Sequence, residues 1–473
     1  MEQSAVKYIS TRGKAPAIGF DDALLGGLAR DGGLYVPQTW PRLDAPAIAG
    51  FRGLPYPELA LRVMRPFMEG SIADAALAGI IDQAYRNFDT AEVAPLVALG
   101  DGEWLLELFH GPTLAFKDMA LQFIGPLFDH VLKARGEWIT VVGATSGDTG
   151  SAAIEACRDR NAIEIFILHP KDRISEVQRR QMTTVLSANV HNIAVAGTFD
   201  DCQALVKAMF NDQPFRDRHR LTAFNSINWA RVMAQIVYYF WAAVRLGAPE
   251  RAVAFAVPTG NFGNVFAGYA ARAMGLPVGQ LVVGSNRNDI LTRFFETGAM
   301  QIDAVHPTIS PSMDIQVSSN FERLLFDLQD RDGRRVAAIM EGFRETGRFA
   351  VEARVLQAAR AMFDGARFDD DATRQTIRGV LEDFGRLIDP HTAVGLAAGR
   401  ARRRDLGVPM VALATAHPAK FPDAVEAATG VRPALPAHLS DLFERPERCA
   451  VLADDLAQLK RHVEERARAR AAA

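Results

Sequence analysis

The sequence predicts an α/β fold with two lobes, each built on a parallel sheet, and an N-terminal capping segment. From about residue 104 onward, short β-rich runs alternate with helical patterns, which is typical of βαβ units. The series is interrupted by a long helical pattern after residue 225 and then begins again. At 473 residues the chain is also too long for one ordinary core, so two or three domains are expected.

The N-terminal segment, residues 1–95, is interpreted as a small, mostly helical cap. It has a short extended start at residues 7–13, glycine-rich turns, and helical patterns at 56–68 and 72–87. Arg12 in the extended start is a candidate substrate contact. A single arginine in an otherwise uninformative segment is more often structural, and both interpretations stay open.

The first α/β lobe is expected over residues 96–225. Its strands are predicted at 138–142, 163–168 and 190–195, and its helices at 150–160 and 175–186. The second and larger lobe is expected over residues 226–473, with a long helix at 229–246 and strands at 253–257, 281–284 and 410–414. It also contains a helical insertion at about 307–389 and a C-terminal helix at about 454–468. Ligands of such sheets collect at the carboxyl ends of the strands, so both lobes are expected to contribute to one site.

Composition and charge favour an enzyme acting on a small molecule. The net charge of -3 gives no electrostatic basis for binding nucleic acid or an anionic membrane. The cysteines at 157, 202 and 449 lack the spacing of a zinc site or a disulfide framework, which favours a reducing cytoplasm and no metal. The N-terminus does not have the pattern of a signal peptide, and the longest apolar run is too short to cross a bilayer.

A turn at residues 107–118 leads one lysine into the start of an apolar-striped helix. Gly111-Pro112 marks the turn, Thr113 is a candidate cap, and apolar residues then recur at helical spacing. Lys117 is therefore placed near the positive end of the helix dipole, which disfavours an ammonium and favours the free amine that attacks an aldehyde. For a lone lysine a solvated surface position is the usual interpretation, so partners elsewhere in the chain must decide.

The strongest partner is a loop between the strand at 253–257 and a helix beginning near residue 265. It contains Gly260, Asn261, Phe262, Gly263 and Asn264. Glycines allow the backbone N–H groups to form a concave set, and the helix N-terminus adds positive potential, so this loop is predicted to hold a phosphate. It is neither a Walker A loop nor a GxGxxG motif. A turn of this composition without a function is also common.

Three further loops carry polar groups at strand ends. Residues 143–151 offer hydroxyls and N–H groups suited to a carboxylate or phosphate, and Asp148 there is either a helix cap or a ligand contact. Residues 414–421 place Thr415 where a ring nitrogen can dock, beside His417 and Lys420, whose roles stay open. Residues 225–231 combine amide, hydroxyl and guanidinium groups, which suit a phosphate ester.

These loops together resemble the threonine synthases, a family of fold type II pyridoxal-phosphate enzymes related to the tryptophan synthase β fold. The likeness rests on motifs in the same order along nearly the whole chain, at residues 8–13, 110–118, 143–150, 258–264 and 414–421. It implies conversion of O-phospho-L-homoserine and water to L-threonine and phosphate, by γ-elimination of phosphate and β-addition of water. The implied enzyme is a carbon-oxygen lyase of threonine biosynthesis with pyridoxal 5'-phosphate as cofactor.

The resemblance also implies roles for individual residues. Lys117 would form the Schiff base and serve as the base, and residues 260–264 would hold the cofactor phosphate. Asp148 would face the ring oxygen and Thr415 the ring nitrogen. The substrate carboxylate would be received by Thr145, Ser146 and Thr149, and the substrate phosphate by Asn225, Ser226 and Arg231. Many fold type II enzymes have asparagine in place of Asp148, so here a hydrogen bond to the ring oxygen requires a proton on one of the two groups.

Three alternatives remain from the sequence. A pyridoxal-phosphate lyase on the same scaffold would eliminate phosphate from the same substrate and release 2-oxobutyrate. An oxidoreductase of the Rossmann type is disfavoured because no GxGxxG motif follows a strand. A binding protein without catalysis is disfavoured by the intact lysine and phosphate loop. The sequence is consistent with a monomer or a homodimer.

Overall fold

The computed structural model describes residues 6–471, and side chains as far as residue 467. The chain forms two compact units, and neither is continuous in sequence. Unit 1 contains the chain up to Phe116 together with Ser226–Pro433, and unit 2 contains Lys117–Asn225 together with the chain from Ala434 onward. Each unit is built around one sheet, so the predicted α/β class with two lobes is confirmed.

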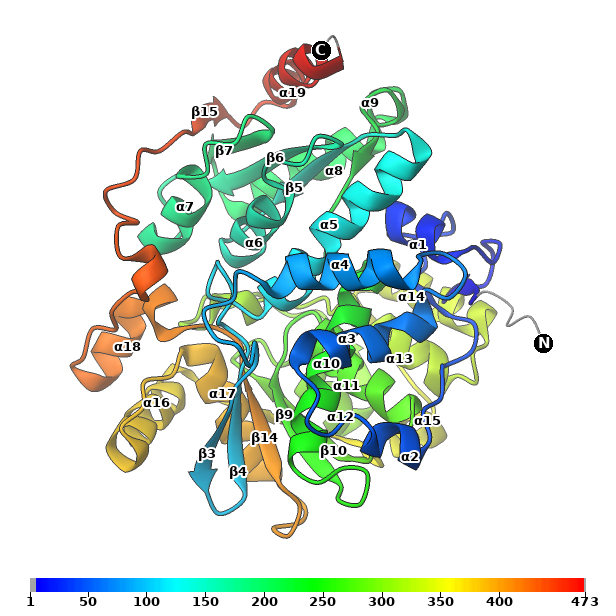
Figure 1. The fold of residues 1–473 in the computed structure, drawn as a ribbon, viewed down its shortest axis with the longest axis vertical. Helices are drawn as coiled ribbons and strands as arrows, with labels where there is room; N and C mark the ends of the chain where they lie inside the picture. Colours follow the sequence, from blue (N-terminus) through cyan, green and yellow to red (C-terminus); the bar gives the residue numbers. More distant parts are fainter. Residues whose placement is uncertain (1–5, 472–473) are drawn as a thin grey trace. The chain divides into compact units, whose positions relative to one another are not determined.

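The sheet of unit 1 has six strands in the order β13-β10-β9-β14-β4-β3 (Figure 1). All neighbours are parallel except β3 and β4, which form an antiparallel pair at one edge. The central strands β9 and β14 are buried throughout, as expected for parallel strands covered on both faces. The strand bounds are β3 (Leu96–Gly100), β4 (Glu103–Glu107), β9 (Val253–Pro258), β10 (Val278–Ser285), β13 (Phe363–Arg367) and β14 (Met410–Ala414).

Helix α17 (Pro390–Arg402) packs on the central strands of this sheet, and helix α11 (Gly263–Ala273) packs on β9 and β10. Helix α10 (Trp229–Arg245) lies against α11 and is buried along almost its whole length. The other helices of unit 1 are α1 (Phe20–Gly26), α2 (Ala45–Ala49), α3 (Tyr56–Met64), α4 (Asp74–Tyr85), α12 (Ile290–Thr297), α13 (Phe321–Leu328), α14 (Gly333–Thr346), α15 (Ala353–Arg360), α16 (Asp370–Phe384) and α18 (Pro422–Thr429).

Unit 1 also carries two small antiparallel sheets, each of two strands. Strand β1 (Tyr8–Ser10) pairs with β2 (Tyr35–Pro37), and β11 (Ala299–Gln301) pairs with β12 (Arg348–Ala350). Three short 3-10 helices complete the unit: η1 (Arg65–Phe67), η2 (Pro311–Met313) and η3 (Pro418–Lys420).

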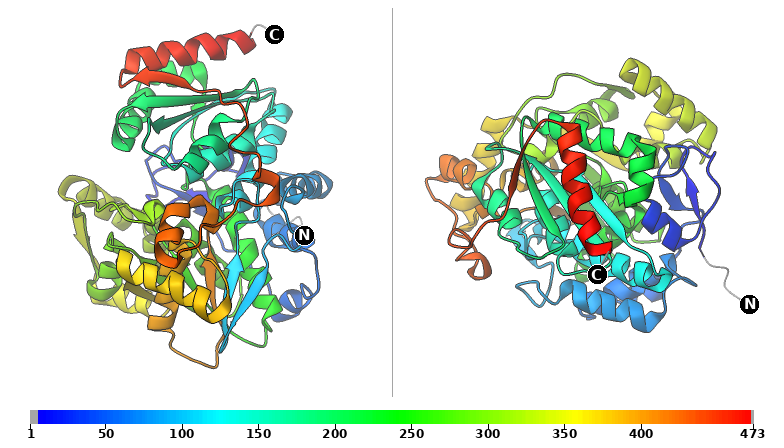
Figure 2. Two further views of the ribbon diagram at one scale, coloured as in Figure 1. Left: turned by 90° about the vertical axis from the view of Figure 1, so that its left-hand side faces the viewer. Right: turned by 90° about the horizontal axis from the view of Figure 1, so that it is seen from above.

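The sheet of unit 2 has five parallel strands in the order β15-β7-β6-β5-β8. Residues of α8 and α19 form a buried cluster with β5, β6 and β7, and Figure 2 shows α19 lying along this sheet. The bounds are α5 (Lys117–Arg135), β5 (Ile139–Ala144), α6 (Asp148–Cys157), β6 (Ile163–Pro170), α7 (Glu176–Thr183), β7 (Val190–Ala196), α8 (Phe199–Asn211), α9 (Gln213–His219), β8 (Leu221–Thr222), η4 (Ala437–Leu439), β15 (Ala450–Ala453) and α19 (Leu456–Ala471).

The chain divides between Asn225 and Ser226, as in the predicted division, but it does not divide at residue 95, and its C-terminal part belongs to unit 2. Strand pairing explains both differences. Strand β4 pairs with β14, so residues 96–116 belong to unit 1 with the N-terminal segment. Strand β15 pairs with β7, so the C-terminal helix belongs to unit 2. The predicted helical insertion contains two strands, β12 and β13, of which β13 forms the edge of the large sheet. The sequence of β13, Phe-Asp-Gly-Ala-Arg, has no β-branched residue and so gives little strand signal.

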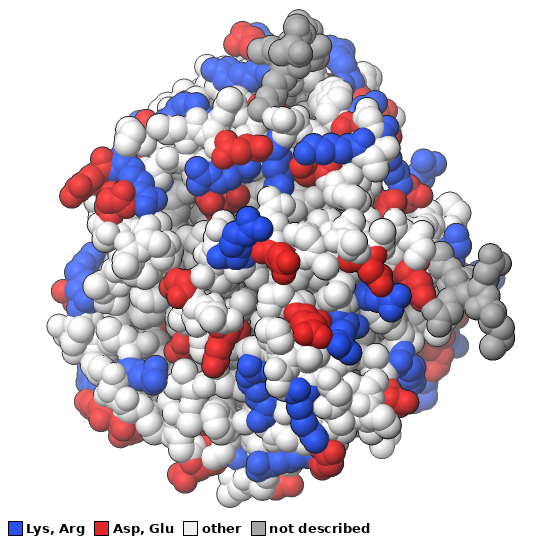
Figure 3. All heavy atoms as spheres, in the orientation of Figure 1, with Lys and Arg blue, Asp and Glu red and all other residues white. Residues whose placement is uncertain are grey.

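Within residues 6–471, no helix is both long enough and apolar enough to cross a membrane. The same part of the chain has no group of three or more His, Cys, Asp or Glu side chains arranged to hold a metal ion. The three cysteines are unpaired. On the face shown in Figure 3, basic and acidic side chains are interspersed, without a field of one sign.

Candidate functional site

Lys117 is the first residue of helix α5, so the predicted position near a helix N-terminus is confirmed. The helix starts later than the candidate cap Thr113, whose carbonyl instead accepts a hydrogen bond of 2.6 Å from Lys420 Nζ. The backbone before the lysine runs along the loop after β14, with Phe116 N–H donating to the Thr415 carbonyl at 2.8 Å. This pairing fixes the chain one residue before Lys117.

The amine of Lys117 lies 3.3 Å from Oδ2 of Asp148 in unit 2. Both side chains are largely buried, with exposed fractions of 12% and 5%. Asp148 is the first residue of helix α6, where a carboxylate is favoured by the helix dipole. A desolvated amine beside a carboxylate is a group whose proton can be moved, which is the property required of a nucleophile or a base.

The hydroxyls of the loop before α6 are of two kinds, one bonded within the loop and the others exposed or partly exposed. The Thr145 hydroxyl is buried and accepts hydrogen bonds from the N–H groups of Gly147 and Gly150, at 3.0 and 2.9 Å. This hydroxyl therefore stabilises the conformation of the loop, and it can contact a ligand only by donating its own proton. Ser146 is exposed and Thr149 is partly exposed, so these two hydroxyls are the ones open to a ligand.

The predicted phosphate loop connects β9 to α11, and the helix begins at Gly263, two residues before the predicted start. Phe262 adopts a left-handed backbone conformation, with φ 62° and ψ −2°, while its ring is buried against Phe321. A left-handed residue next to helical ones turns successive N–H groups toward one side, which forms an anion-binding nest. Together with the N-terminal N–H groups of α11, the loop is built to receive an anion.

The carbonyls of this loop are held on its other side. The Gly260 carbonyl accepts a hydrogen bond of 2.7 Å from the Ser318 hydroxyl. The Asn261 carbonyl accepts hydrogen bonds from both the backbone N–H and the side-chain amide of Asn320. A Cβ at position 260 would lie 3.0 Å from the Ser312 carbonyl, so any larger residue would crowd this approach. Residues 318 and 320 belong to the region predicted as helical, and the signal that could have revealed them is the polar run Ser-Ser-Asn at 318–320.

Asn264 supplies a buried donor that fits an anion. Its Oδ1 accepts hydrogen bonds from the hydroxyls of Tyr238, at 2.5 Å, and Tyr239, at 3.1 Å, which fixes the orientation of the amide. In the part of the chain that the structure describes, its Nδ2 has no hydrogen-bond partner. An unpaired buried amide is costly, so a bound phosphate oxygen is the natural partner for this atom.

Thr415 is buried at the end of β14, and its backbone is held by a polar network. Its N–H donates a hydrogen bond of 3.2 Å to the Thr392 hydroxyl. That hydroxyl itself donates a hydrogen bond to the carboxylate of Asp389, which is fully buried. The same aspartate is bonded to the ring of His391, whose other nitrogen accepts from the Ser312 N–H. Asp389 therefore braces both the loop that carries Thr415 and the segment that packs behind Gly260.

The segment predicted to bind a phosphate ester is split by the boundary between the units, with Asn225 in unit 2 and Ser226 in unit 1. Asn225 is exposed and Ser226 is partly exposed. Arg231 lies in the first turn of α10 and is 3% exposed. Burial lowers the pKa of its guanidinium to about 10, so the group remains a cation at neutral pH in a poorly solvated position.

Three residues whose roles the sequence left open have structural contacts. Arg12 forms a bidentate ion pair with Glu322, with both nitrogen-oxygen distances at 3.0 Å. Burial lowers the pKa of His417 to about 4, and its neutral ring accepts from the Ala419 N–H at the start of η3. Lys420 is fully buried against the Thr113 carbonyl. Arg12 therefore ties the N-terminal segment to α13, and His417 and Lys420 help to hold the loop after β14.

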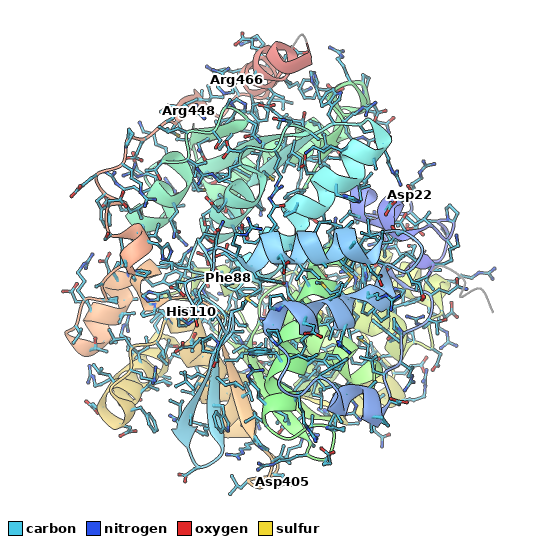
Figure 4. The ribbon with its side chains drawn as sticks, viewed as in Figure 1. Asp22, Phe88, His110, Asp405, Arg448 and Arg466 are labelled. Carbon is cyan, nitrogen blue, oxygen red and sulfur yellow. The ribbon has the colours of Figure 1, made fainter. Side chains whose placement is uncertain are left out.

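His110, labelled in Figure 4, lies between two carboxylates, with Nδ1 2.6 Å from Asp89 and Nε2 2.9 Å from Glu107. Burial alone would lower its pKa, but the bonds to Glu107 and Asp89 outweigh burial and raise it. A raised pKa contributes stability below the ordinary value of about 6.5, and this contribution is lost as the pH rises through the folded-state pKa.

We therefore expect His110→Gln to lower the melting temperature more at about pH 6 than at about pH 9. Differential scanning fluorimetry over this range measures the effect. The exposed His438→Gln serves as the matched control and should show no such trend. A deficit in His110→Gln that is equal at both pH values would contradict the assignment of a charged ring.

The buried amine, the nest with an unpaired amide and the hydroxyl at a strand end are the parts that a pyridoxal-phosphate enzyme requires. A family model described as pyridoxal-phosphate dependent enzyme matches residues 91–415. Models of the threonine synthase N terminus and C-terminal region match residues 7–85 and 392–463.

Individual relatives agree along the whole chain. The threonine synthase of Pseudomonas aeruginosa is 60% identical over 97% of this chain and 98% of its own. The solved structure of a pyridoxal-phosphate-bound threonine synthase from Brucella melitensis is 53% identical, with a TM-score of 0.97 over 98% of this chain and 100% of that one. The solved structure of threonine synthase from yeast is 40% identical, with a TM-score of 0.93 over 98% of this chain and 99% of that one. The chain belongs to the threonine synthase family of pyridoxal-phosphate-dependent enzymes.

Proposed function

We propose that this protein converts O-phospho-L-homoserine and water to L-threonine and phosphate. The observation that carries the proposal is the likeness to the Pseudomonas aeruginosa threonine synthase along almost the full length of both chains. The local structure of each unit supports it independently, because unit 2 has the largely buried Lys117 amine and unit 1 has a loop suited to a phosphate. Reaction in the cytoplasm, and a monomeric or homodimeric state, stay predictions of the sequence.

The residues that would hold pyridoxal phosphate are those with fitting donors in the structure. Lys117 is the covalent attachment point, and residues 260–264 bind the phosphate, with the Asn264 amide as a side-chain donor. Thr415 offers its hydroxyl to the ring nitrogen and Asp148 its carboxyl to the ring oxygen. When bound, the cofactor supplies an electron sink for charge that develops at the substrate's α-carbon.

The chain's own groups then move protons and orient the substrate. With the cofactor bound, the Lys117 amine would take one proton from the α-carbon and one from the β-carbon, and it would return one proton to the γ-carbon and one to the α-carbon. The hydroxyls of Ser146 and Thr149, with the Thr145 proton, orient the substrate carboxylate. Asn225, Ser226 and Arg231 bind the substrate phosphate, which leaves from the γ-carbon, while water adds its hydroxyl at the β-carbon.

Product analysis tests this proposal. Incubation of the loaded enzyme with O-phospho-L-homoserine should release phosphate and L-threonine in equal amounts, as measured by phosphate assay and chromatography of amino acids. If phosphate is released together with 2-oxobutyrate and without threonine, the enzyme is instead a phospho-lyase on the same substrate. If no phosphate is released, the substrate assignment is wrong.

A further inference from the structure

Gln178, a residue of helix α7, contacts the carboxylate that faces the reactive lysine. Its Nε2 donates a hydrogen bond of 2.9 Å to Oδ1 of Asp148, and both groups are buried. The other oxygen of the same carboxylate, Oδ2, is the one that lies 3.3 Å from Lys117 Nζ. The two oxygens of Asp148 therefore have different neighbours, a neutral amide on one side and an amine on the other.

The orientation of the Gln178 amide is set by the start of its own helix. Ser175 is the N-cap of α7, and its hydroxyl oxygen accepts the Gln178 N–H at 3.2 Å. The hydroxyl proton is then available to the side-chain oxygen Oε1 of Gln178, 3.1 Å away. With Oε1 occupied as an acceptor by this hydroxyl, the amide presents its NH2 group to Asp148.

Gly147 provides the space for this contact. It has a φ of +136°, and a Cβ on it would lie 2.3 Å from the side-chain carbon Cδ of Gln178. Any other residue would push the amide away from the carboxylate. The loop before α6 and the N-terminus of α7 are thus shaped around one hydrogen bond to Asp148.

We propose that Gln178 is a positioning residue that reserves Oδ1 of Asp148 as an acceptor, so that any proton on this carboxyl resides on Oδ2, beside Lys117. The proposal rests on the proposed function and refines it. A carboxyl group at the ring oxygen can form a hydrogen bond only when one of the two partners carries a proton. Because Nε2 occupies Oδ1, that proton is confined to the side of the carboxyl that faces the reacting groups.

The proton affinity of the carboxyl should therefore depend on Gln178. Helices α5 and α7 and strand β6 pack on α6, and α5 presents the Lys117 amine to the carboxylate while α7 presents the neutral amide. A hydrogen bond donated to a carboxylate favours its charged form, so loss of the amide makes the carboxyl hold a proton more tightly. A second carboxylate at the position of the amide does so more strongly, because two adjacent carboxylates share one proton.

The test compares Gln178→Met and Gln178→Glu with the wild type, all loaded with pyridoxal phosphate. The visible absorption of each protein is titrated with pH. We expect the pH at the midpoint of the absorption change to be higher in Gln178→Met than in the wild type. In Gln178→Glu it should be higher still, by about one pH unit or more. Turnover should fall roughly tenfold in Gln178→Met with a smaller change in KM, because a bond to a charged group near the reaction is lost.

The matched control is Val177→Ala, which shortens the buried neighbour on the same helix and leaves the Gln178 amide in place. It should lower the melting temperature without moving the pH midpoint. Midpoints in both Gln178 variants that equal the wild-type value overturn the positioning role, even if the variants are less stable. A wild-type protein without visible absorption overturns the proposed function and this inference together, so the two failures are told apart by the wild type alone.

Discussion

Lys117→Ala should reduce threonine formation by at least about a thousandfold, because it removes both the attachment point of the cofactor and the base. The side chain is largely buried beside Asp148, so no neighbouring solvated amine is expected to replace it. Borohydride treatment followed by mass spectrometry of peptides should place a pyridoxyl group on Lys117 in the wild type. The variant should lack this label.

The matched control for this experiment is Lys133→Ala on the same helix. Lys133 lies in the last turn of α5 and pairs with Asp129 at the surface, with 61% of its side chain exposed. A surface ion pair of this kind contributes little to stability, so the variant should keep wild-type turnover and label. If the label is found on another lysine, or if Lys117→Ala turns over normally, the assignment of the reactive amine is wrong.

The strands that end at the candidate site were predictable because they are buried on both faces. Residues 253–257 and 410–414 are unbroken apolar runs, and both are strands of the large sheet. The loops after them carry glycine or polar residues, which have few other reasons to occur at a strand end. The position of Lys117 near the start of α5 followed in the same way from the Gly-Pro turn and the apolar spacing behind it, although the helix begins after the candidate cap Thr113.

Contacts between distant parts of the sequence could not be predicted. Asn320 binds the Asn261 carbonyl across 59 residues, and Gln178 reaches Asp148 across 30. A polar residue in a helical pattern is usually solvated, so the sequence does not indicate a buried partner at either position. The sequence also cannot show that the Thr145 hydroxyl is already engaged by two backbone N–H groups, since this depends on how the loop closes.

Pairing of distant strands caused the differences in the fold. Strand β15 lies about 250 residues beyond its neighbour β7 in the chain, and its four residues are partly or fully exposed. Such a strand lacks the apolar alternation that would identify it. Its pairing brings the C-terminal helix to unit 2, although the sequence order suggests that it continues unit 1.

Arg231→Ala should raise KM for O-phospho-L-homoserine by about 30-fold or more, with a smaller effect on turnover, because a buried cation is lost from the proposed phosphate site. Initial-rate kinetics measure both quantities. Arg245→Lys, at the exposed end of the same helix, is the matched control and should leave KM unchanged. An unaltered KM in Arg231→Ala would show that the substrate phosphate binds elsewhere.

Arg231→Lys separates charge from geometry through its pH dependence. Burial lowers the pKa of Arg231 to about 10, so the wild-type cation persists through the neutral and mildly alkaline range. The ordinary pKa of a lysine is about two units below the ordinary pKa of an arginine. The same burial therefore brings the titration of a lysine at this position closer to neutral pH. The cation is lost as the pH rises through that pKa, so KM of Arg231→Lys should increase between about pH 7 and pH 9 while that of the wild type changes little. A pH-independent KM in this variant would mean that the cation does not contact the substrate phosphate, since a neutral amine binds a dianion far more weakly than an ammonium.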